Sequence, residues 1–333
     1  MNFSCVEGPS NAAKITRSLW FSISGLAAVF GNTFVLWLFY KNESLRTVSN
    51  RFLVSLSVAD LLVGAVVTPT FLAGHLPQST DNQNVKHFLW IHSTAATTWN
   101  LCCVSVDRFI AIRFPFSYQG ILTKERCCVL ITVIWVISLF LPFPVIFVKN
   151  EVTGHQAELW LSFAFILFVF PVIVVSLCYI CIFRVANKQH KQVRKEYQRT
   201  NYSLCQSLNN FKAIKTVGLV LGVFITTWMP CLIVELVTYY YRKMEHKRCG
   251  ELELHSVAWP WVEVIALTSS AINPVIYYFR NNEFRQAFKR TFDQRRDCLC
   301  HKNAPDPDAK QQQTRKVESV ETRGKLQTKE AQL

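Results

Sequence analysis

Residues Val85–Ile112 read VKHFLWIHSTAATTWNLCCVSVDRFIAI, and this stretch decides how the rest of the chain must fold. It is long enough to cross a bilayer, because a helix of ~20 residues spans the hydrocarbon core. Its middle nevertheless carries several polar side chains, namely His92, Ser93, Thr94, Thr97, Thr98 and Asn100. Hydrocarbon offers hydroxyl and amide groups no hydrogen-bond partners. The stretch is therefore predicted to be the central helix of a membrane bundle, surrounded by other helices.

The composition of the whole chain agrees with a membrane protein. Half of the 333 residues are hydrophobic and only 17% are charged, and the mean hydropathy is +0.19. The apolar residues gather in runs of membrane-spanning length. The predicted spans are residues 18–40, 50–74, 85–112, 127–148, 159–184, 212–240 and 255–279. The sequence thus predicts an all-α membrane protein, a bundle of seven transmembrane helices.

The charge distribution predicts the orientation of the chain in the membrane. The net charge of +14 lies in particular loops, which does not favour nucleic-acid binding by a basic face of a soluble fold. Loop 185–211 carries five Lys or Arg residues and a single acid, Glu196. Basic loops stay in the cytoplasm. We therefore expect a multi-pass plasma-membrane protein with its N-terminus outside and its C-terminus in the cytoplasm.

The two ends of the chain carry candidate modification sites. The expected organisation is an outer tail (1–17), the seven-helix domain (18–279), a short amphipathic helix on the inner leaflet (280–296) and a disordered cytoplasmic tail (297–333). Of the N-glycosylation sequons, only the one at Asn2 lies outside by this topology. Cys298 and Cys300 are either palmitoylated or ordinary free thiols. Cys5 and Cys249, both outside, form a disulfide or stay as two free thiols.

Several short motifs occur in order, one to a span. They are Gly31-Asn32, Leu56-Ser57-Val58-Ala59-Asp60, Asp107-Arg108-Phe109, Trp135, Pro171 with Tyr179, Phe224 with Trp228-Met229-Pro230, and Asn273-Pro274-Val275-Ile276-Tyr277. With this set the chain resembles the rhodopsin-like (class A) G-protein-coupled receptors over roughly residues 19–292.

The resemblance implies a switch at the inner end of the central helix. Arg108 would be held by Asp107 in the resting state and released toward a G protein. Many relatives add an acid at the base of span six, where this chain has Ser207-Leu208-Asn209-Asn210. Without that acid Arg108 would be restrained less in the resting state, which predicts measurable basal signalling. The other switch residues that the resemblance implies are Phe116, Tyr179, Phe224, Trp228, Pro230, Asn273, Pro274 and Tyr277.

Asp60 lies in the middle of span two, where an uncompensated carboxylate costs at least ~2.5 kcal/mol. The resemblance implies an allosteric sodium ion held with Asn32, Thr97, Ser270 and Asn273, and no other cofactor. The alternative is a hydrogen-bonded polar core without an ion.

The outer half departs from the family pattern. The usual disulfide between span three and the second outer loop is absent, because Gln83 stands at the first position and 149–158 has no cysteine; this resembles melanocortin-like receptors. Trp90 replaces the amine-binding aspartate and Leu267 the retinal lysine, which disfavours a typical monoamine receptor and an opsin.

The predicted ligand contacts are Trp90, Thr94, Glu235 and Glu263. The two acids either attract a cationic ligand, such as a basic peptide or an amine, or pair with Lys86, His87 or His255 as structure.

The sequence has no nucleophile–base pair, phosphate loop or metal spacing, so we expect a receptor and not an enzyme. The expected partners are a heterotrimeric G protein, an arrestin and a receptor kinase, an extracellular ligand and membrane lipid. The alternatives are a lipid-sensing receptor of the same class, a receptor-like protein without G-protein coupling, and a seven-span transporter or channel.

Overall fold

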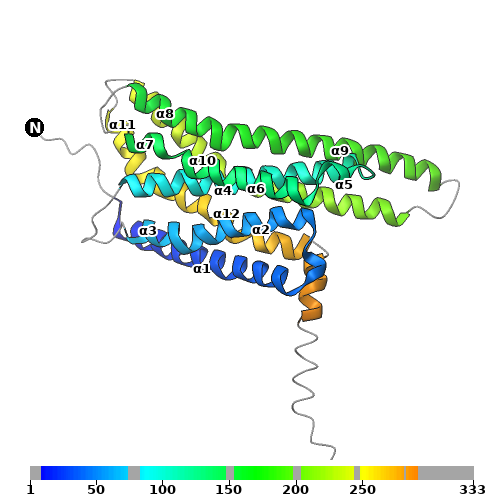
Figure 1. Ribbon diagram of the computed structural model, residues 1–333. Coiled ribbons are helices and arrows are strands. Elements are labelled where there is room, and N and C mark those ends of the chain that lie inside the picture. The colour runs from blue at the N-terminus through cyan, green and yellow to red at the C-terminus, as the bar shows by residue number, and fades with distance from the viewer. Residues whose placement is uncertain are drawn as a thin grey trace, which may run out of the picture. The chain divides into compact units, whose positions relative to one another are not determined.

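The computed structural model describes residues 9–73, 83–147, 154–197, 204–243, 248–280 and 283–291, and every element within these ranges is helical. The chain divides into two compact units, residues 1–285 and 286–333. The first unit holds the bundle of long helices (Figure 1). In the second unit the described residues, 286–291, are helical.

The first three predicted spans are present and begin earlier than expected. They are α1 (Asn11–Lys41), α2 (Val48–Leu62) continued by η2 (Val63–Val67) and α3 (Thr68–Ala73), and α4 (Gln83–Arg113). A short 3-10 turn, η1 (Glu43–Leu45), separates the first two spans. Side-chain caps explain two starts: Ser10 accepts a hydrogen bond from the amide of Ala13, and Thr47 accepts one from the amide of Asn50. Residues 11–17, expected in the outer tail, therefore belong to the first helix.

The remaining spans are also present, with several breaks and extensions. The elements are α5 (Tyr118–Ile121), α6 (Lys124–Phe140), α7 (Phe143–Phe147), α8 (Gly154–Ala164), η3 (Phe165–Val169), α9 (Phe170–Tyr197), α10 (Leu204–Lys243), α11 (Arg248–Glu253), η4 (Leu254–Ala258) and α12 (Trp259–Arg280). Span four is interrupted by a turn at Leu141 and Pro142, between α6 and α7, because proline cannot continue the hydrogen-bond pattern of a helix. Residues 283–291 form a further helix within the predicted amphipathic segment.

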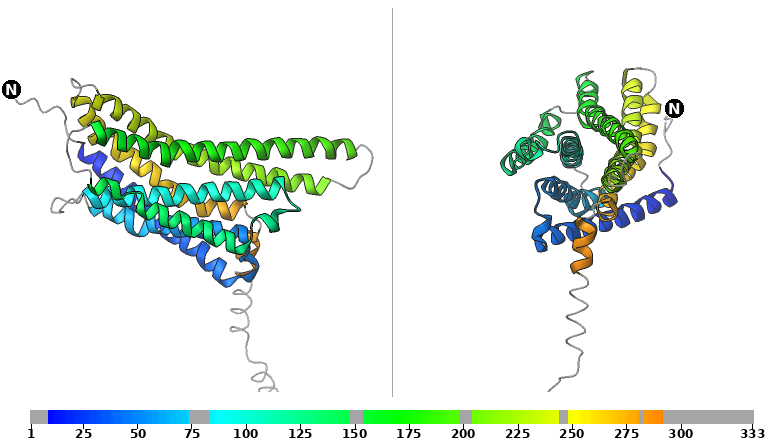
Figure 2. Two further views of the ribbon diagram at one scale, coloured as in Figure 1. Left: turned by 45° about the horizontal axis from the view of Figure 1, so that its top comes forward. Right: turned by 90° about the vertical axis from the view of Figure 1, so that its right-hand side faces the viewer.

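Helix α4 lies inside the bundle, as its polar middle predicted. It packs against α2, α6 and α9, and the end-on view in Figure 2 shows the long helices arranged around it. Its polar groups bond largely to its own backbone: the Thr98 hydroxyl donates to the Thr94 carbonyl at 2.8 Å, and the Asn100 amide donates to the Ala96 carbonyl at 2.7 Å. The helix thereby pairs part of its buried polar side chains within itself.

Hydropathy alone finds fewer spans than the bundle contains. Five of the described helices are long and apolar enough to cross a membrane, or six if the bent pair at the C-terminal end counts as one span. Helix α4 is not among them, because the polar side chains that it turns toward its neighbours lower its hydropathy. The burial of those side chains, and not their average polarity, identifies α4 as a span.

Candidate functional site

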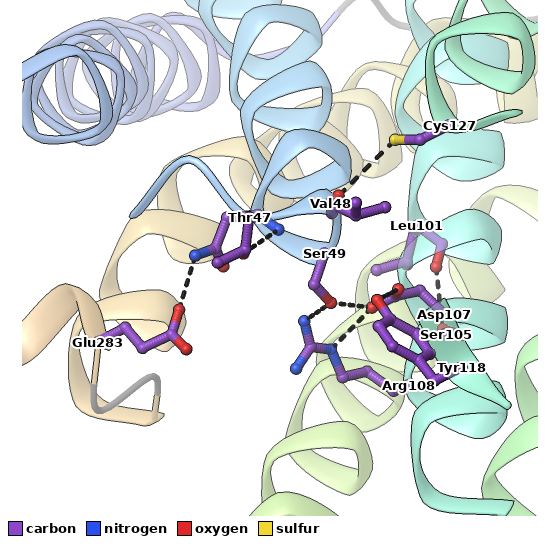
Figure 3. Close-up of polar contacts among 11 residues, drawn as sticks. Thr47, Val48, Ser49, Leu101, Ser105, Asp107, Arg108, Tyr118, Cys127 and Glu283 are labelled. Carbon is purple, nitrogen blue, oxygen red and sulfur yellow. Dashed lines mark hydrogen bonds and ion pairs between the residues drawn. The ribbon is translucent and has the colours of Figure 1, made fainter. Parts of the chain in front are cut away.

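The inner end of α4 carries a compact polar cluster (Figure 3). The Nε atom of Arg108 lies 3.1 Å from the Oδ2 atom of Asp107, so the predicted ion pair is present. The hydroxyl of Ser49, at the start of α2, donates to the Asp107 carboxylate and accepts a hydrogen bond from the Arg108 guanidinium. The Asp107 side chain is 1% exposed and that of Arg108 is 35% exposed. A buried carboxylate thus holds a half-exposed guanidinium at the inner mouth of the bundle.

Tyr118, the first residue of α5, completes the shell around the carboxylate. Its hydroxyl donates to the Oδ1 atom of Asp107 at 2.6 Å. Burial, followed by this hydrogen bond, raises the pKa of Tyr118 to about 12, so the hydroxyl keeps its proton at neutral pH. Both carboxylate oxygens are therefore occupied by partners that sequence reasoning did not identify.

Two further predicted switch residues are Phe116, which follows α4 in the chain, and Tyr179, which packs beside the end of α4. Phe116 is fully exposed between α4 and α5, where an apolar side chain is free to enter a partner protein. Tyr179 packs with Phe109 and Ile112 against Ile182 of α9, beside the end of α4. The base of span six, residues 207–210, is helical, but its side chains lie outside the described part of the structure. The predicted weakness of that restraint stays a prediction.

The Asp60 cluster has the composition expected of a site for a small cation. Asp60 is fully buried, and the Asn273 amide donates to its Oδ2 atom at 2.7 Å. Thr97 and Ser270 also interact with the carboxylate, and the Asn32 amide donates to the Ser270 carbonyl at 3.0 Å. The structure therefore brings together all five predicted residues.

Three buried oxygens in this cluster have no hydrogen-bond partner: Asp60 Oδ1, Asn32 Oδ1 and Thr97 Oγ1. Oxygens left in this condition cost free energy unless a donor or a cation meets them. One carboxylate with neutral oxygens suits a hard monovalent cation such as sodium. The residues present thus fit the ion that the resemblance implied.

The motif at the end of α12 contacts this cluster through Asn273. Tyr277, one turn further on, is buried, and its hydroxyl has no hydrogen-bond partner. Pro274 lies inside α12 and so removes one backbone hydrogen bond from the helix. This part of α12 therefore lacks one backbone hydrogen bond and carries the buried hydroxyl of Tyr277, which has no hydrogen-bond partner.

An aromatic column leads from the outer half toward the middle of α10. The ring of Trp228 lies 6.2 Å from that of Phe224, 5.5 Å from that of Phe168 and 6.0 Å from that of Trp90. Trp228 is buried, its indole nitrogen has no hydrogen-bond partner, and Pro230 lies two residues on, inside α10. The predicted i, i+4 pair of Phe224 and Trp228 is confirmed as a contact.

The predicted ligand residues of α4 lie on top of this column. Trp90 is 4% exposed, and its ring contacts those of Phe71 at 6.2 Å and Trp259 at 6.1 Å. Thr94, one turn deeper on the same face, is buried, and its hydroxyl has no hydrogen-bond partner. Two polar groups, Thr94 Oγ1 and Trp228 Nε1, are therefore available at this depth.

Each of the two predicted acids has basic neighbours. Glu235 is buried in α10 and interacts with Arg242 of the same helix. Glu263 of α12 accepts a hydrogen bond from the Trp259 indole and interacts with Lys86 of α4 and Arg17 of α1. Lys86 was one of the predicted structural partners, whereas Arg17 was not predicted.

The other two predicted structural partners were His87 and His255. The ring of His87 contacts that of Trp160 at 5.0 Å. The side chain of His255 lies outside the described part.

The remaining predicted sites fall largely outside the described residues, namely Asn2, Cys5, Cys298 and Cys300. Cys249 is disulfide-bonded. The free cysteines among the described residues are Cys102, Cys103, Cys127, Cys128, Cys178, Cys181 and Cys231. The partner of Cys249 is therefore none of these seven.

The functional residues that were missed share one property, which is that their partners are distant in sequence. Ser49 lies 58 and 59 residues from the two groups that it bridges. Tyr118 is only 11 residues from Asp107, but the sequence does not specify how the chain turns between them. One signal could have identified Arg17, which is a basic residue directly before an apolar run. The predicted outer tail, residues 1–17, included it.

Comparison with known proteins gives a consistent result. The profile of the seven-transmembrane receptors of the rhodopsin family matches residues 31–277. The octopamine receptor beta-2R of Chilo suppressalis is 27% identical, over 91% of this chain and 84% of its own. The adenosine receptor A2a of Canis lupus familiaris is 28% identical over 79% and 68%. The human histamine H2 receptor is 27% identical over 85% and 81%.

Proposed function

This chain belongs to the rhodopsin family of seven-transmembrane receptors, and on that premise we propose how it transmits a signal. It is a class A G-protein-coupled receptor of the plasma membrane that responds to an extracellular ligand, and it is not an enzyme. Its relatives give no support to a transporter or channel. The proposal concerns the residues: a ligand in the outer half repacks the aromatic column, and Arg108 is then freed for the G protein.

The observation that carries this proposal is that Arg108 is held by partners and is also partly exposed. Its guanidinium is held by Asp107 and Ser49 yet remains 35% exposed at the inner end of α4. A surface ion pair is worth little, but removing one partner of a buried carboxylate is costly. The arrangement is thus a latch that can open without unfolding, provided that the shell around Asp107 rearranges.

The route from ligand to latch is proposed to run through residues in contact or one turn apart. The ligand would contact Trp90, Thr94, Glu235 and Glu263. The ring of Trp90 lies 6.0 Å from that of Trp228. Movement of Trp228 would bend α10 at Pro230, where the backbone ladder is interrupted. Tyr277 and Tyr179 would then supply hydroxyls near Arg108, and Phe116 would insert into the G protein.

An allosteric sodium ion at Asp60 is part of the same proposal. Asp60, Asn32, Thr97, Ser270 and Asn273 would hold it through the buried oxygens that lack partners. The ion would supply a positive charge that compensates the buried carboxylate and would hold α1, α2, α4 and α12 in the resting arrangement. The candidate ligands are a basic peptide, an amine and a lipid.

The finer topology is also proposed. The N-terminus would lie outside with Asn2 glycosylated, and Cys5 would be the disulfide partner of Cys249. The C-terminus would lie in the cytoplasm, where Cys298 and Cys300 carry palmitate and an arrestin and a receptor kinase bind.

The function is tested with purified receptor in lipid nanodiscs. Nucleotide exchange on a panel of G proteins is recorded without ligand, for wild type, Arg108→Ala and the control Arg46→Ala at an exposed inner-loop position. We expect basal exchange above the receptor-free rate with one G protein, its loss in Arg108→Ala, and its retention in Arg46→Ala. Exchange that does not depend on Arg108 would refute the proposed latch. Adding peptides, amines and lipids in turn then identifies the ligand class.

A further inference from the structure

We infer that the outer binding site recognises an organic anion, a carboxylate or phosphate on an apolar body, through Lys86 and Arg17, whose charge partner in the absence of ligand is Glu263. The inference rests on the proposed function only in assuming that the ligand enters the outer half of the bundle.

The first step concerns Arg17, which is buried although it lies in a membrane helix. It is 6% exposed in the outer part of α1 and interacts with Glu263 of α12. Guanidinium groups at such positions are costly, usually paired, and kept for function. Arg17 therefore brings a permanent positive charge to a site that the sequence presented as acidic.

The second step concerns Lys86, in the first turn of α4. Its ammonium group lies 6.0 Å from the centre of the Phe71 ring and interacts with Glu263. A cation over an aromatic face is held in place by the ring quadrupole. Two basic side chains from two helices thus face the same carboxylate.

The third step concerns Glu263, whose carboxylate is already surrounded. The Trp259 indole donates a hydrogen bond to it, and Lys86 and Arg17 supply its charge partners. An incoming ammonium group would have to displace these cations or lie beside them, and like charges at close range repel. An incoming carboxylate would instead meet two cations and could bind Arg17 in a bidentate manner.

The fourth step concerns the residues that would contact the rest of the ligand. Next to the charged groups lies the ring of Trp90, which contacts the ring of Phe71 at 6.2 Å and that of Trp259 at 6.1 Å. One turn deeper are Thr94 and Trp228, with a hydroxyl and an indole N–H that have no partners. From Lys86 to Thr94 the rise along α4 is about 12 Å. The matching ligand is a small amphipathic anion of that length with a hydrogen-bond acceptor at its apolar end.

The test addresses the charged end and the apolar body of the ligand, with two sets of probes in which one terminal group is an anion, a neutral amide or a cation. One set is indole-3-propionate, its amide and 3-(3-aminopropyl)indole; the other is octanoate, octanamide and octylamine. The melting temperature of purified receptor in detergent is measured with each probe at millimolar concentration, without a G protein. We expect an anionic probe to raise it by roughly 2–5 °C, and its amide and amine partners by less than about 1 °C.

Variants separate this inference from its opposite. Lys86→Gln should abolish the stabilisation by the anion, and the control Lys124→Gln, at the exposed start of α6, should retain it. Glu263→Gln should keep or increase the stabilisation, because it removes a competing carboxylate. If Lys86→Gln does not fold, Arg17→Lys should reduce the effect while retaining the charge.

Stabilisation by the amines, loss of the anion effect in Glu263→Gln, or no shift with either anion would overturn the inference. None of these outcomes bears on Arg108, whose test is nucleotide exchange. A failure here therefore leaves the proposed latch standing.

Discussion

At the scale of single residues, the resting state depends on how the Asp107 carboxylate is satisfied. Its two oxygens accept hydrogen bonds from the hydroxyls of Ser49 and Tyr118, and the carboxylate forms an ion pair with Arg108. Hydrogen bonds to charged groups contribute about 1.5–3 kcal/mol each. Because these contacts exist in the closed cluster, their loss should favour the state in which Arg108 is free.

We therefore expect Ser49→Ala and Tyr118→Phe each to raise basal nucleotide exchange severalfold, up to about tenfold. The control is Ser117→Ala, beside Tyr118, whose side chain makes no capping hydrogen bond. Exchange is measured with GTPγS on reconstituted receptor. Unchanged exchange in both variants would show that Arg108 is restrained elsewhere.

The pKa of Tyr118 adds a pH dependence to the same contact. The folded-state pKa of about 12 lies above the ordinary value of 10.0, because burial and the Asp107 hydrogen bond favour the neutral phenol. The stability that this group contributes is fully present below pH 10 and is lost as pH rises toward about 12. Over the physiological range, the hydroxyl of Tyr118 stays a donor.

The buried oxygens around Asp60 lead to a second residue-scale prediction. If sodium fills the site, replacing choline by sodium at constant ionic strength should raise the melting temperature of wild type. At ten times Kd the gain is ~1.4 kcal/mol, or roughly 3–6 °C. Asp60→Asn should lose this response, and Glu43→Gln, at an exposed acid, should keep it. An equal sodium response in wild type and Asp60→Asn would rule out the ion.

How much of the site was predictable follows from the same residues. The family resemblance placed Asp60 and Asn273, each in a motif of its own span, together with Thr97. Ser49 and Arg17 were not, because no local pattern tells which side chain of a distant helix will meet a given charge. The sequence indicates the functional groups, but packing selects their partners.

At the scale of elements, the position of each span was predictable and its ends were not. Hydrophobic length set the spans, whereas the ends follow from caps such as Ser10 and from helices that continue past the membrane, as α9 does to Tyr197. The π-helical segments η2, η3 and η4 have no signal in the hydrophobic pattern. Each inserts one extra residue per turn and so rotates the side chains beyond it.

Close packing of α1 on span two depends on two glycines. A Cβ on Gly64 would lie 2.8 Å from the Gly25 carbonyl oxygen and 3.0 Å from a Val29 methyl group. Because a backbone atom cannot move aside cheaply, Gly64→Ala should cost about 1–3 kcal/mol. The melting temperature should then fall by roughly 2–12 °C.

Gly222 provides the matched control for this prediction. It lies in α10 with no atom within 4 Å of its Cβ position, so Gly222→Ala should be neutral or stabilising by up to ~1 kcal/mol. Thermal unfolding of both variants is measured in the same detergent. Equal stability of the two variants would mean that α1 and span two are less tightly packed than the structure shows.

At the scale of the whole molecule, α4 connects the two functional ends. From Lys86 to Arg108 it rises about 33 Å, with the proposed ligand site at one end and the latch at the other. Its outer end lacks the disulfide of most relatives and is held instead by ring contacts, such as His87 with Trp160 at 5.0 Å. Such contacts are weaker than a covalent bond, so this end of α4 is freer to respond to a ligand.

The disulfide of Cys249 is then the expected covalent restraint on the outer face. We predict that Cys5 is its partner, because both lie outside in the proposed topology and the described free cysteines are excluded. Cys5→Ser, Cys249→Ser and the double variant should lower stability by the same amount, about 2–5 kcal/mol. Each removes the same bond, so the effects should not add.

The measurement is thermal unfolding with and without reductant, together with peptide mapping under non-reducing conditions. Wild type should lose stability in reductant and the three variants should not, whereas Cys128→Ser, at an exposed free thiol, should behave as wild type. Additive losses from the two single variants would show that Cys5 and Cys249 do not pair.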